Sequence, residues 1–195
     1  NEDFIICEIG GTVGDIESLP FLEAIRQMRY ELGSTNALFI HLTLIPYIAA
    51  ACELKTKPTQ HSVKELRSIG IQPDLLVCRA EKKIPRELKE KVALFCNVQS
   101  HLVFDAYDVK SIYELPLVFH NQGLDEAVTQ MLNIWTRRPD LSGWLETVER
   151  LHNPTGSIVV GVVGKYTNVI DSYKSIGESL VHAGIANQVE VQVTY

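Results

Sequence analysis

The sequence has few cysteines and no long apolar run, and these absences argue against several classes of protein, among them disulfide-rich and membrane-spanning ones. Its four cysteines, Cys7, Cys52, Cys78 and Cys96, include no Cys-x-x-Cys pair, so we expect buried free thiols in a reducing compartment rather than a metal site or disulfides. No apolar run approaches the roughly 20 residues of a membrane-spanning helix, so no membrane partner is expected. With 18 Lys and Arg against 24 Asp and Glu, the net charge of −6 argues against a nucleic-acid partner.

Other features are missing as well. The sequence contains no internal repeat, no low-complexity tract and no GxxxxGK[ST] phosphate loop. No signal peptide precedes the first expected strand, because Asn1-Glu2-Asp3 leads directly into it, and we expect an upstream piece to be absent. What is present, 195 residues of which 46% are hydrophobic, can bury the core of one or two domains.

Strand and helix signals alternate along most of the chain. Apolar runs predict strands at 4–7, 37–45, 75–78 and 102–107. Helical spacing and caps predict helices from Ser18 to Gly33, over 63–69 behind a Ser62/Glu65 capping box, around Leu88, Val92 and Phe95, and over 123–132 and 141–151. This alternation predicts a doubly wound, mostly parallel α/β sheet that binds ligands at the carboxyl ends of its strands.

A boundary is expected at Asn153-Pro154-Thr155-Gly156. Beyond it the pattern predicts a strand over 157–163, a helix over 172–183 that ends at Gly184, and a strand over 189–193. The last part of the chain therefore reads as a single β-α-β unit.

One short stretch is suited to a polyphosphate. Lys55-Thr56-Lys57-Pro58-Thr59-Gln60-His61-Ser62 places two lysines, two hydroxyls and a glutamine amide before an expected helix. The lysines supply charge, and the free amides of a helix start add donors and a positive dipole. Pro58 restricts the loop before a ligand arrives. A solvated basic loop before a capped helix would carry the same residues, so the residues alone leave both interpretations open.

A second stretch is suited to a metal–nucleotide complex. The expected strand at 4–7 leads into Glu8 and then into Gly10-Gly11-Thr12-Val13-Gly14-Asp15-Ile16-Glu17. A carboxylate at the carboxyl end of a core strand, followed by glycines that adopt positive φ, is typical of magnesium sites in α/β nucleotide enzymes. The alternative is an acid that only ends a strand.

Three isolated residues are also of interest. His41 lies in an expected core strand, where a buried, hydrogen-bonded histidine is favoured over a catalytic base. Arg79 follows the strand at 75–78 and points to the usual ligand edge. Lys91 lies beside an apolar helix stripe, so its stem can pack while its ammonium reaches inward, whereas Lys89 and Glu90 are expected on the solvated surface.

Both stretches closely resemble the CTP synthase family, and the resemblance extends over almost the whole chain. The matching residues are Glu8 to Phe21, Lys55 to Gln60, Ser62 to Leu66, Pro73-Asp74-Leu75, Ser111-Ile112-Tyr113 and Ile158 to Tyr166. The match is to the middle of the family's chain. In that family ATP phosphorylates O4 of UTP, and ammonia, released from glutamine by a glutaminase domain, displaces the phosphate. Mg²⁺ is required and GTP is an allosteric activator.

The resemblance implies site residues position by position, none of them catalytic. It makes Glu8 a magnesium ligand. It assigns the UTP and CTP triphosphate to Lys55, Thr56, Lys57, Pro58, Thr59, Gln60 and Lys91. A separate pocket for the base and ribose of inhibitory CTP falls on Asp15, Ile16 and Glu17. ATP contacts fall on Tyr107, Asp108, Val109 and Arg79, with less motif support.

The resemblance also implies an organisation. Residues 1–138 would form a P-loop amidoligase domain, of the dethiobiotin synthetase type, without its N-terminal phosphate loop. Residues 139–156 would be a linker with a helix, and 157–195 the start of a class I glutamine amidotransferase domain. Because the glutaminase nucleophile is expected beyond Tyr195, the segment should be inactive alone. The implied partners are UTP, CTP, ATP, glutamine or ammonia and further copies in a cytoplasmic homotetramer, with filaments as a further assembly.

Two alternatives remain at this stage. Another ATP-dependent P-loop amidoligase, such as a relative of dethiobiotin synthetase or of the cobyrinic acid amidases, would share the acid after the core strand but has no reason to carry Lys-Thr-Lys-Pro-Thr-Gln. A non-catalytic module for nucleotide binding or assembly would keep the binding motifs without turnover.

Overall fold

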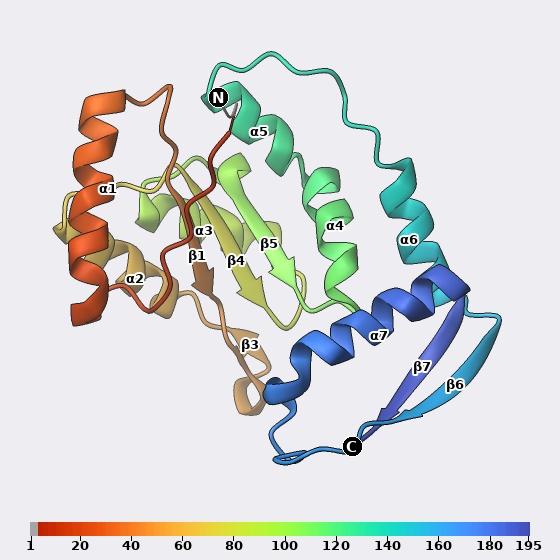
Figure 1. Ribbon diagram of the computed structural model, residues 1–195. Helices are drawn as coiled ribbons and strands as arrows, with labels where there is room; N and C mark the ends of the chain where they lie inside the picture. The colour runs from red at the N-terminus through yellow and green to blue at the C-terminus, as the bar shows by residue number, and fades with distance from the viewer. Residues whose placement is uncertain (1–3) are drawn as a thin grey trace. The chain divides into compact units, whose positions relative to one another are not determined.

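The structure, a computed structural model, describes residues 4–195 apart from the side chain of Ile170, and the chain divides between Arg137 and Arg138 into two compact units. The first unit is built on a parallel sheet in the order β1-β4-β5, formed by β1 (Ile40–Leu44), β4 (Leu75–Ala80) and β5 (Val103–Tyr107). The three strands run in the same direction (Figure 1). The predicted α/β fold with a parallel sheet is confirmed.

Helices pack on both faces of this sheet (Figure 1), but Ile40, Leu42 and Leu44 of β1 remain exposed on one of them. On one face, Leu76 and Cys78 of β4 pack with residues of α2 (Lys57–Ser68) and α3 (Arg86–Cys96). On the other face, Leu75 and Val77 pack with residues of α4 (Leu115–Gln122) and α5 (Leu124–Met131). The alternation of β4 side chains between two cores explains its continuous apolar run. The unit also contains α1 (Leu19–Leu32) and 3-10 turns at Ile16–Ser18, Ala49–Ala51, Ser100–Leu102 and Ile112–Glu114.

Two expectations for the first unit are wrong. Residues 4–7 form no strand, and Ile6 is 94% exposed, because no strand of the described chain supplies hydrogen-bond partners. The capping box at Ser62 is not used either. Helix α2 begins at Lys57 after Thr56, with Pro58 in its first turn, where a proline is favoured because no amide donor is needed there.

A short hairpin and helix α4 were not predicted. Strand β2 (Tyr47–Ile48) pairs antiparallel with β3 (Glu53–Leu54), and the hairpin leads into α2. Lys82 lies over the Tyr47 ring, with Nζ 3.8 Å from the ring centroid, so the loop after β4 contacts this hairpin.

Hydrogen bonds from helix α2 to β1 are buried between the two elements. The hydroxyl of Thr59, which is fully buried, accepts a bond from Thr43 Oγ1 at 3.0 Å and donates to the Leu44 carbonyl at 3.1 Å. One turn further along the helix, Ser62 Oγ lies 2.9 Å from His41 Nε2. Burial lowers the pKa of His41, so the folded state favours the neutral imidazole. The hydrogen bond expected for His41 is confirmed, although the residue is half-buried rather than fully buried.

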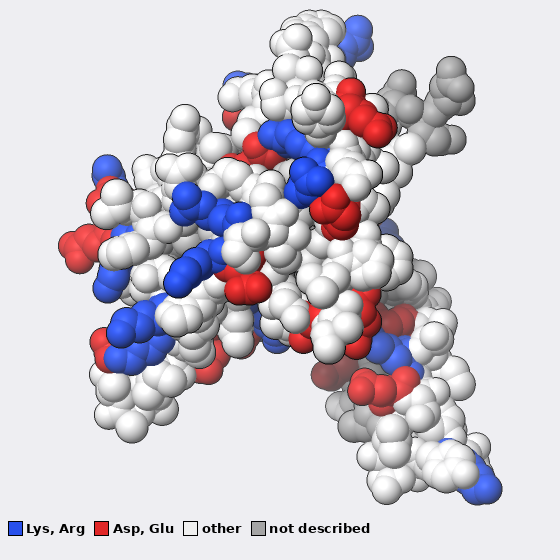
Figure 2. Space-filling view, turned by 90° about the vertical axis from the view of Figure 1, so that its left-hand side faces the viewer, with Lys and Arg blue, Asp and Glu red and all other residues white. Residues whose placement is uncertain are grey.

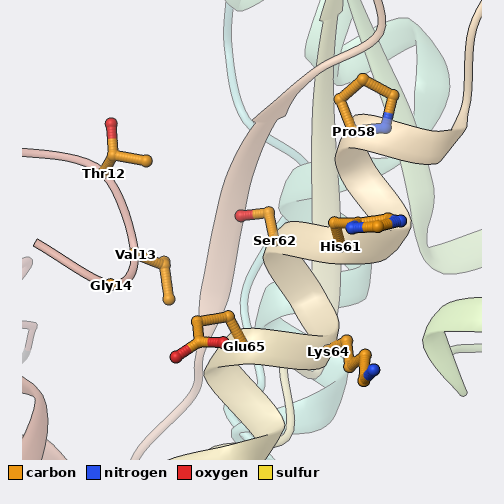
Figure 3. Close-up of a pocket in the computed structure, with 8 residues that line it drawn as sticks. All are labelled: Thr12, Val13, Gly14, Pro58, His61, Ser62, Lys64 and Glu65. Carbon is orange, nitrogen blue, oxygen red and sulfur yellow. The ribbon is translucent and has the colours of Figure 1, made fainter.

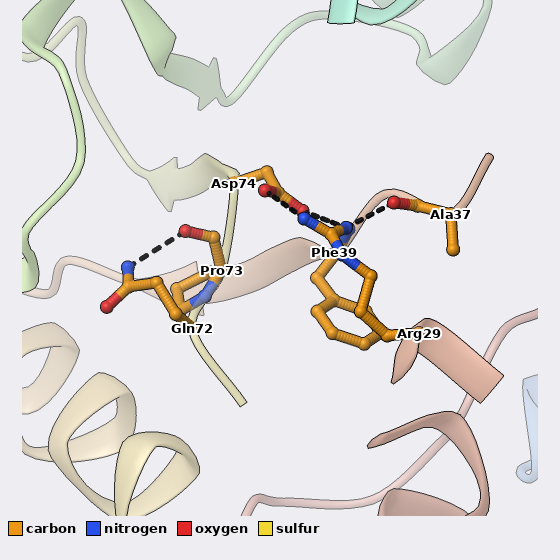
Figure 4. A network of polar contacts seen from close by, with 6 residues as sticks. All are labelled: Arg29, Ala37, Phe39, Gln72, Pro73 and Asp74. Carbon is orange, nitrogen blue, oxygen red and sulfur yellow. Dashed lines mark hydrogen bonds and ion pairs between the residues drawn. The ribbon is translucent and has the colours of Figure 1, made fainter. Parts of the chain in front are cut away.

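At the amino ends of the strands, an ion pair fastens α1 to the sheet (Figure 4). Arg29 donates from Nη1 and Nη2 to the two carboxylate oxygens of Asp74 at 2.8 and 2.9 Å, and also to the Ala37 carbonyl. Asp74 in addition accepts from the Phe39 amide at 2.7 Å. Both charged side chains are largely buried, at 22% and 15% exposed. A bidentate pair in this setting contributes more than a surface ion pair.

The second unit is small. Helix α6 (Ser142–His152) precedes β6 (Gly156–Gly161), and α7 (Lys174–Asn187) connects β6 to a parallel β7 (Val189–Thr194), with a 3-10 turn at Ile170–Tyr173. The predicted β-α-β unit is present. We expected Gly184 to end this helix, but it lies inside α7. A Cβ at this position would come 2.7 Å from the Val189 carbonyl oxygen. Within residues 4–195 no helix is long and apolar enough to cross a bilayer.

Replacing Asp74 by Asn should destabilise the first unit. The change removes the charge partner of Arg29 and leaves a guanidinium that is largely buried, at an expected cost of about 2–3 kcal/mol in the free energy of unfolding. Urea unfolding followed by circular dichroism measures this. Glu23→Gln is the matched control, because Glu23 pairs with Arg26 at the surface and should leave the midpoint almost unchanged. Equal effects of the two changes would contradict the anchoring role of Asp74.

His41 should make the fold less stable in mild acid. Because its pKa is lowered in the folded state, the unfolded chain binds a proton there more readily, and stability falls as the pH drops through about 6.5. Urea midpoints at pH 7.5 and 5.5 should therefore differ more for the unmodified chain than for His41→Asn. The exposed His101, changed to Asn, is the control and should keep the full acid loss. An identical acid loss in His41→Asn would refute the prediction.

Candidate functional site

The carboxyl ends of the three parallel strands form one edge, and most of the predicted site residues lie along it. The Ile45 amide donates to the Arg79 carbonyl at 2.8 Å, and the Asp108 amide donates to the Ala80 carbonyl at 3.0 Å, so the chain leaves β1, β4 and β5 at the same level. The β2–β3 hairpin follows β1 at this edge (Figure 1). In parallel α/β sheets this edge is where ligands bind.

The predicted polyphosphate segment forms the start of α2 at this edge. Its two threonine hydroxyls are buried, and both are engaged within the protein. The Thr59 hydroxyl makes the hydrogen bonds to β1 described above. The Thr56 hydroxyl accepts a hydrogen bond from Gln60 Nε2 at 3.1 Å. The hydroxyls therefore hold the helix start in place. Pro58 has no amide hydrogen, Thr59 is fully buried, and the Gln60 amide donates to the Thr56 carbonyl at 3.1 Å. The amide of the exposed Lys57 is therefore the first-turn backbone donor that is left for a ligand.

The two lysines of this segment are exposed. Lys57 is the first residue of α2, and Lys55 precedes it by two residues. Lys55 pairs with Glu53 of the hairpin, and both side chains of this pair are about half exposed, at 47% and 52%. A surface ion pair of this kind contributes little to stability, so Lys55 can exchange Glu53 for another anion.

The glycine-rich segment forms a tight turn before α1. Gly11 and Gly14 have positive φ, of 87° and 103°, as predicted, whereas Gly10 does not. The turn is closed by the Asp15 amide, which donates to the Thr12 carbonyl at 3.0 Å, and by the Thr12 amide, which donates to Asp15 Oδ2 at 3.0 Å. Asp15 is thus held by its own turn. The side chains of Asp15, Ile16, Glu17 and Glu8 are all exposed.

An open cavity of about 610 Å³ joins this turn to α2. Thr12, Val13 and Gly14 line one side, and α2 lines the other with Pro58, His61, Ser62, Lys64 and Glu65. Figure 3 shows Ser62 and Glu65 directed toward the turn and Lys64 directed away from it. The structure therefore brings the two predicted stretches together at Pro58, although Glu8, Glu17, Lys55 and Lys57 do not line this cavity.

The predicted adenine contacts lie at the ends of β4 and β5. Arg79 is exposed, Tyr107 and Val109 are half-buried and Asp108 is exposed. In the strand register Arg79 pairs with Ala106 and Ala80 with Tyr107, which places Arg79 and Tyr107 on neighbouring strands one residue apart. These residues share the edge with Lys55 and Lys57 but do not line the cavity at the glycine turn.

The expectations for the two lysines of α3 are reversed. Lys91 is exposed and does not reach inward, whereas Lys89 forms an ion pair with the fully buried Asp105 of β5. Helix geometry explains the difference, because Lys89 shares a face with Val92, Ala93 and Cys96, which are buried. Phe95, predicted on the core stripe, is 57% exposed for the same reason. A signal was available: Asp105 interrupts an apolar strand, and a buried carboxylate requires a partner.

The cysteines divide into two pairs. Burial raises the pKa of the Cys78 thiol to about 12 and that of Cys96 to about 11, so both are inert thiols, as predicted. Cys7 and Cys52 are exposed, which corrects the expectation of burial for these two. Cys52 closes the hairpin turn in the left-handed conformation, at φ 50°, which places its side chain outside the core.

Glu8, the predicted magnesium ligand, is one of the exposed carboxylates near the glycine turn that could bind a divalent cation. Within the described part of the chain no group of three or more His, Cys, Asp or Glu could hold a metal by itself. Magnesium in nucleotide enzymes is commonly held by one or two carboxylates, with substrate phosphates and water as the other ligands. An exposed Glu8 beside the glycine turn fits that pattern, because a nucleotide would have to supply the remaining ligands.

Charges on the visible face are local. On the face shown in Figure 2, Lys and Arg occur in small groups with Asp and Glu between them. A few lysines at the start of a helix suit a compact anion such as a phosphate chain.

Comparison with known proteins identifies the family. The family model described as "CTP synthase N-terminus" matches residues 1–134. Proteins named CTP synthase from Rhizorhabdus wittichii and Geobacter sulfurreducens are each 58% identical over 194 residues, covering 99% of this chain and 36% of each relative. The CTP synthase of Koribacter versatilis is 58% identical over 193 residues, covering 99% of this chain and 35% of that protein.

The chain thus spans about 36% of the length of the curated relatives that it matches. Its matched region includes the parallel sheet, the glycine turn and the lysines at the start of α2. The chain belongs to the CTP synthase family.

Proposed function

We propose that this chain forms part of a CTP synthase, which aminates UTP to CTP at the expense of ATP with ammonia from glutamine, and that it supplies the triphosphate site of that enzyme. One observation carries the proposal: the start of α2, with exposed Lys55 and Lys57, is fixed at the carboxyl edge of a parallel sheet and adjoins the glycine turn. Membership of the family supports the reaction, and this geometry supports the assignment of the triphosphate site to this chain.

The electrostatics of the α2 start fit a triphosphate. A nucleoside triphosphate carries roughly four negative charges, and two or three lysines with a helix amino terminus are a suitable complement. In this assignment Lys55 and Lys57 bind phosphate oxygens, and the Lys57 amide at the start of α2 donates a hydrogen bond. Thr56, Thr59 and Gln60 hold these groups in place through their own contacts. Lys91, exposed on α3, is the third lysine of the proposed set.

Glu8 is the proposed magnesium ligand. The cation would neutralise charge on the phosphoryl group that moves from ATP to UTP. Glu8 would anchor it from the protein side, while Gly11 and Gly14 let the backbone approach the nucleotide closely. The exposed loop of Asp15, Ile16 and Glu17 would bind the base and ribose of inhibitory CTP.

The adenine of ATP is assigned to the end of β5. Tyr107, Asp108 and Val109 would border the base, with Arg79 nearby on β4. The proposal also includes the finer architecture: residues 1–138 as part of a P-loop amidoligase domain, 139–156 as a linker, and 157–195 as the beginning of a glutaminase domain. GTP activation, a homotetramer, filaments and a cytoplasmic location are proposed on the family resemblance alone.

Replacing Lys57 by Ala should weaken the use of UTP. Loss of one charged contact to a phosphate costs about 1.5–3 kcal/mol, or about 10- to 150-fold in the KM for UTP. The assay is conversion of UTP to CTP with ATP, magnesium and ammonium chloride. The enzyme is a full-length chimera in which this chain replaces the segment that it matches in the Geobacter sulfurreducens CTP synthase. Ammonium bypasses glutamine hydrolysis, so the assay reports on the synthase reaction.

Arg67→Ala is the matched control, because Arg67 is an exposed cation in the last turn of the same helix. It should leave the KM for UTP unchanged. A Lys57→Ala chimera with an unchanged KM for UTP would disprove the triphosphate assignment. A folded chimera that binds UTP and forms no CTP would instead favour a non-catalytic role in nucleotide binding or assembly.

A further inference from the structure

A buried polar cluster lies just behind the strand end assigned to ATP. It consists of Lys89 on α3, Asp105 in β5 and Gln122 at the end of α4, and it is called the Lys89–Asp105–Gln122 unit below. Asp105 is completely buried, whereas Tyr107 and Val109, a few residues further along, are half-buried. None of its three residues belongs to the predicted binding sets.

The carboxylate of Asp105 joins two segments of this edge. One oxygen accepts a hydrogen bond from the Ile84 amide at 3.2 Å, in the loop that follows β4, and the other forms the ion pair with Lys89. Asp105 therefore holds the loop between Ala80 and α3 against the end of β5. A fully buried carboxylate is costly without a charged partner, so Lys89 is required for this arrangement.

Gln122 binds the backbone of the same residue. Its Oε1 accepts from the Asp105 amide at 3.0 Å, and its Nε2 donates to the Asp105 carbonyl at 2.8 Å. In the described part of the chain β5 is an edge strand, with β4 on one side only. The side-chain amide of Gln122 thus takes the place of a peptide group in a neighbouring strand and satisfies both backbone groups. Lys89 Nζ also donates to Gln122 Oε1 at 3.3 Å, which closes the unit.

The unit connects both helical layers to one point of the edge strand. Lys89 comes from the helix layer on one face of the sheet and Gln122 from the layer on the other. From that point the chain continues directly to Tyr107, Asp108 and Val109. On the neighbouring strand, the loop held by Asp105 continues from Arg79 and Ala80. Asp105 thus bonds the loop that follows Arg79 and Ala80, and its own strand continues into Tyr107, Asp108 and Val109.

We propose that the Lys89–Asp105–Gln122 unit is a positioning device for adenine-nucleotide binding, which sets the relative placement of the β5 end and the loop after β4. This inference rests on the proposed function for the identity of the nucleotide. The three side chains touch no ligand in this account. They act through Tyr107, Asp108, Val109 and Arg79, and the triphosphate segment at the start of α2 has its own attachment to β1.

The test measures binding of two nucleotides separately. Calorimetry of the same full-length chimera gives the Kd of a non-hydrolysable ATP analogue and the Kd of UTP. Gln122→Met keeps the volume and helix propensity of the side chain but removes both backbone hydrogen bonds. We expect the Kd of the ATP analogue to rise about five- to tenfold and that of UTP to stay within about twofold.

Lys89→Met should have the same selective effect, and Lys89→Arg should restore ATP-analogue binding because it keeps the charge beside Asp105. Glu90→Gln is the control, since Glu90 is exposed on the same helix and pairs only with the surface residue Arg86. If Lys89→Met fails to fold by circular dichroism, Gln122→Met decides the question.

An equal loss of ATP-analogue and UTP binding in Gln122→Met would overturn the inference in favour of a general structural role. An unchanged Kd for both nucleotides would also overturn the inference, and so would failure of the unmodified chimera to bind the ATP analogue.

The proposed function is judged separately, by CTP formation. A chimera that binds the ATP analogue but forms no CTP refutes that function, while the Gln122→Met comparison still decides the role of the unit.

Discussion

The hydroxyl of Thr59 determines where α2 starts and how it lies on the sheet. It is fully buried, accepts a hydrogen bond from Thr43 and donates one to the Leu44 carbonyl, at the point where β1 ends. These bonds fix the first helical turn at the carboxyl edge, with Lys57 exposed at its start. The cavity to the glycine turn depends on the same placement, because α2 lines it from Pro58 to Glu65.

Two further buried polar groups hold the rest of this frame. Asp74 ties α1 and the start of β1 together at the amino ends of the strands through Arg29 and the Phe39 amide. Asp105 ties the end of β5 to the loop after β4 and to α3. Each carboxylate bonds both a cation and a backbone amide, and this is how a buried charge becomes tolerable. The apolar cores stabilise the sheet, and these polar contacts set the register of the parts that would meet a nucleotide.

The sequence predicted those elements whose signals are local. The strand at Leu75 was visible as a continuous apolar run and the strand around Phe104 as an apolar run with one interruption, at Asp105. The first helix was predicted from Ser18 to Gly33, close to the observed α1. The start of α2 was predicted wrongly at Ser62, because the capping-box pattern is local. The helix starts at Lys57, where Thr59 bonds a strand that is distant in the sequence. The inward lysine was misassigned for a similar reason: Lys89 rather than Lys91 faces β5, and only the position of Asp105 reveals this. The segment at 4–7 has strand composition, but a strand also needs a partner, which composition does not report.

The most direct test of this account is a double-mutant cycle on Thr43 and Thr59, with the affinity of the full-length chimera for UTP as the readout. Thr43→Val and Thr59→Val each remove one end of the buried hydroxyl contact while keeping the side-chain shape. The account predicts that each weakens UTP binding several-fold, by roughly the 0.5–1.5 kcal/mol of one hydrogen bond, and that the double variant is no weaker than the worse single one. If Thr59→Val, which removes the bond to the Leu44 carbonyl as well as the contact with Thr43, binds UTP as tightly as the unmodified chimera, the claim that the contact of Thr59 with β1 creates the triphosphate site is wrong.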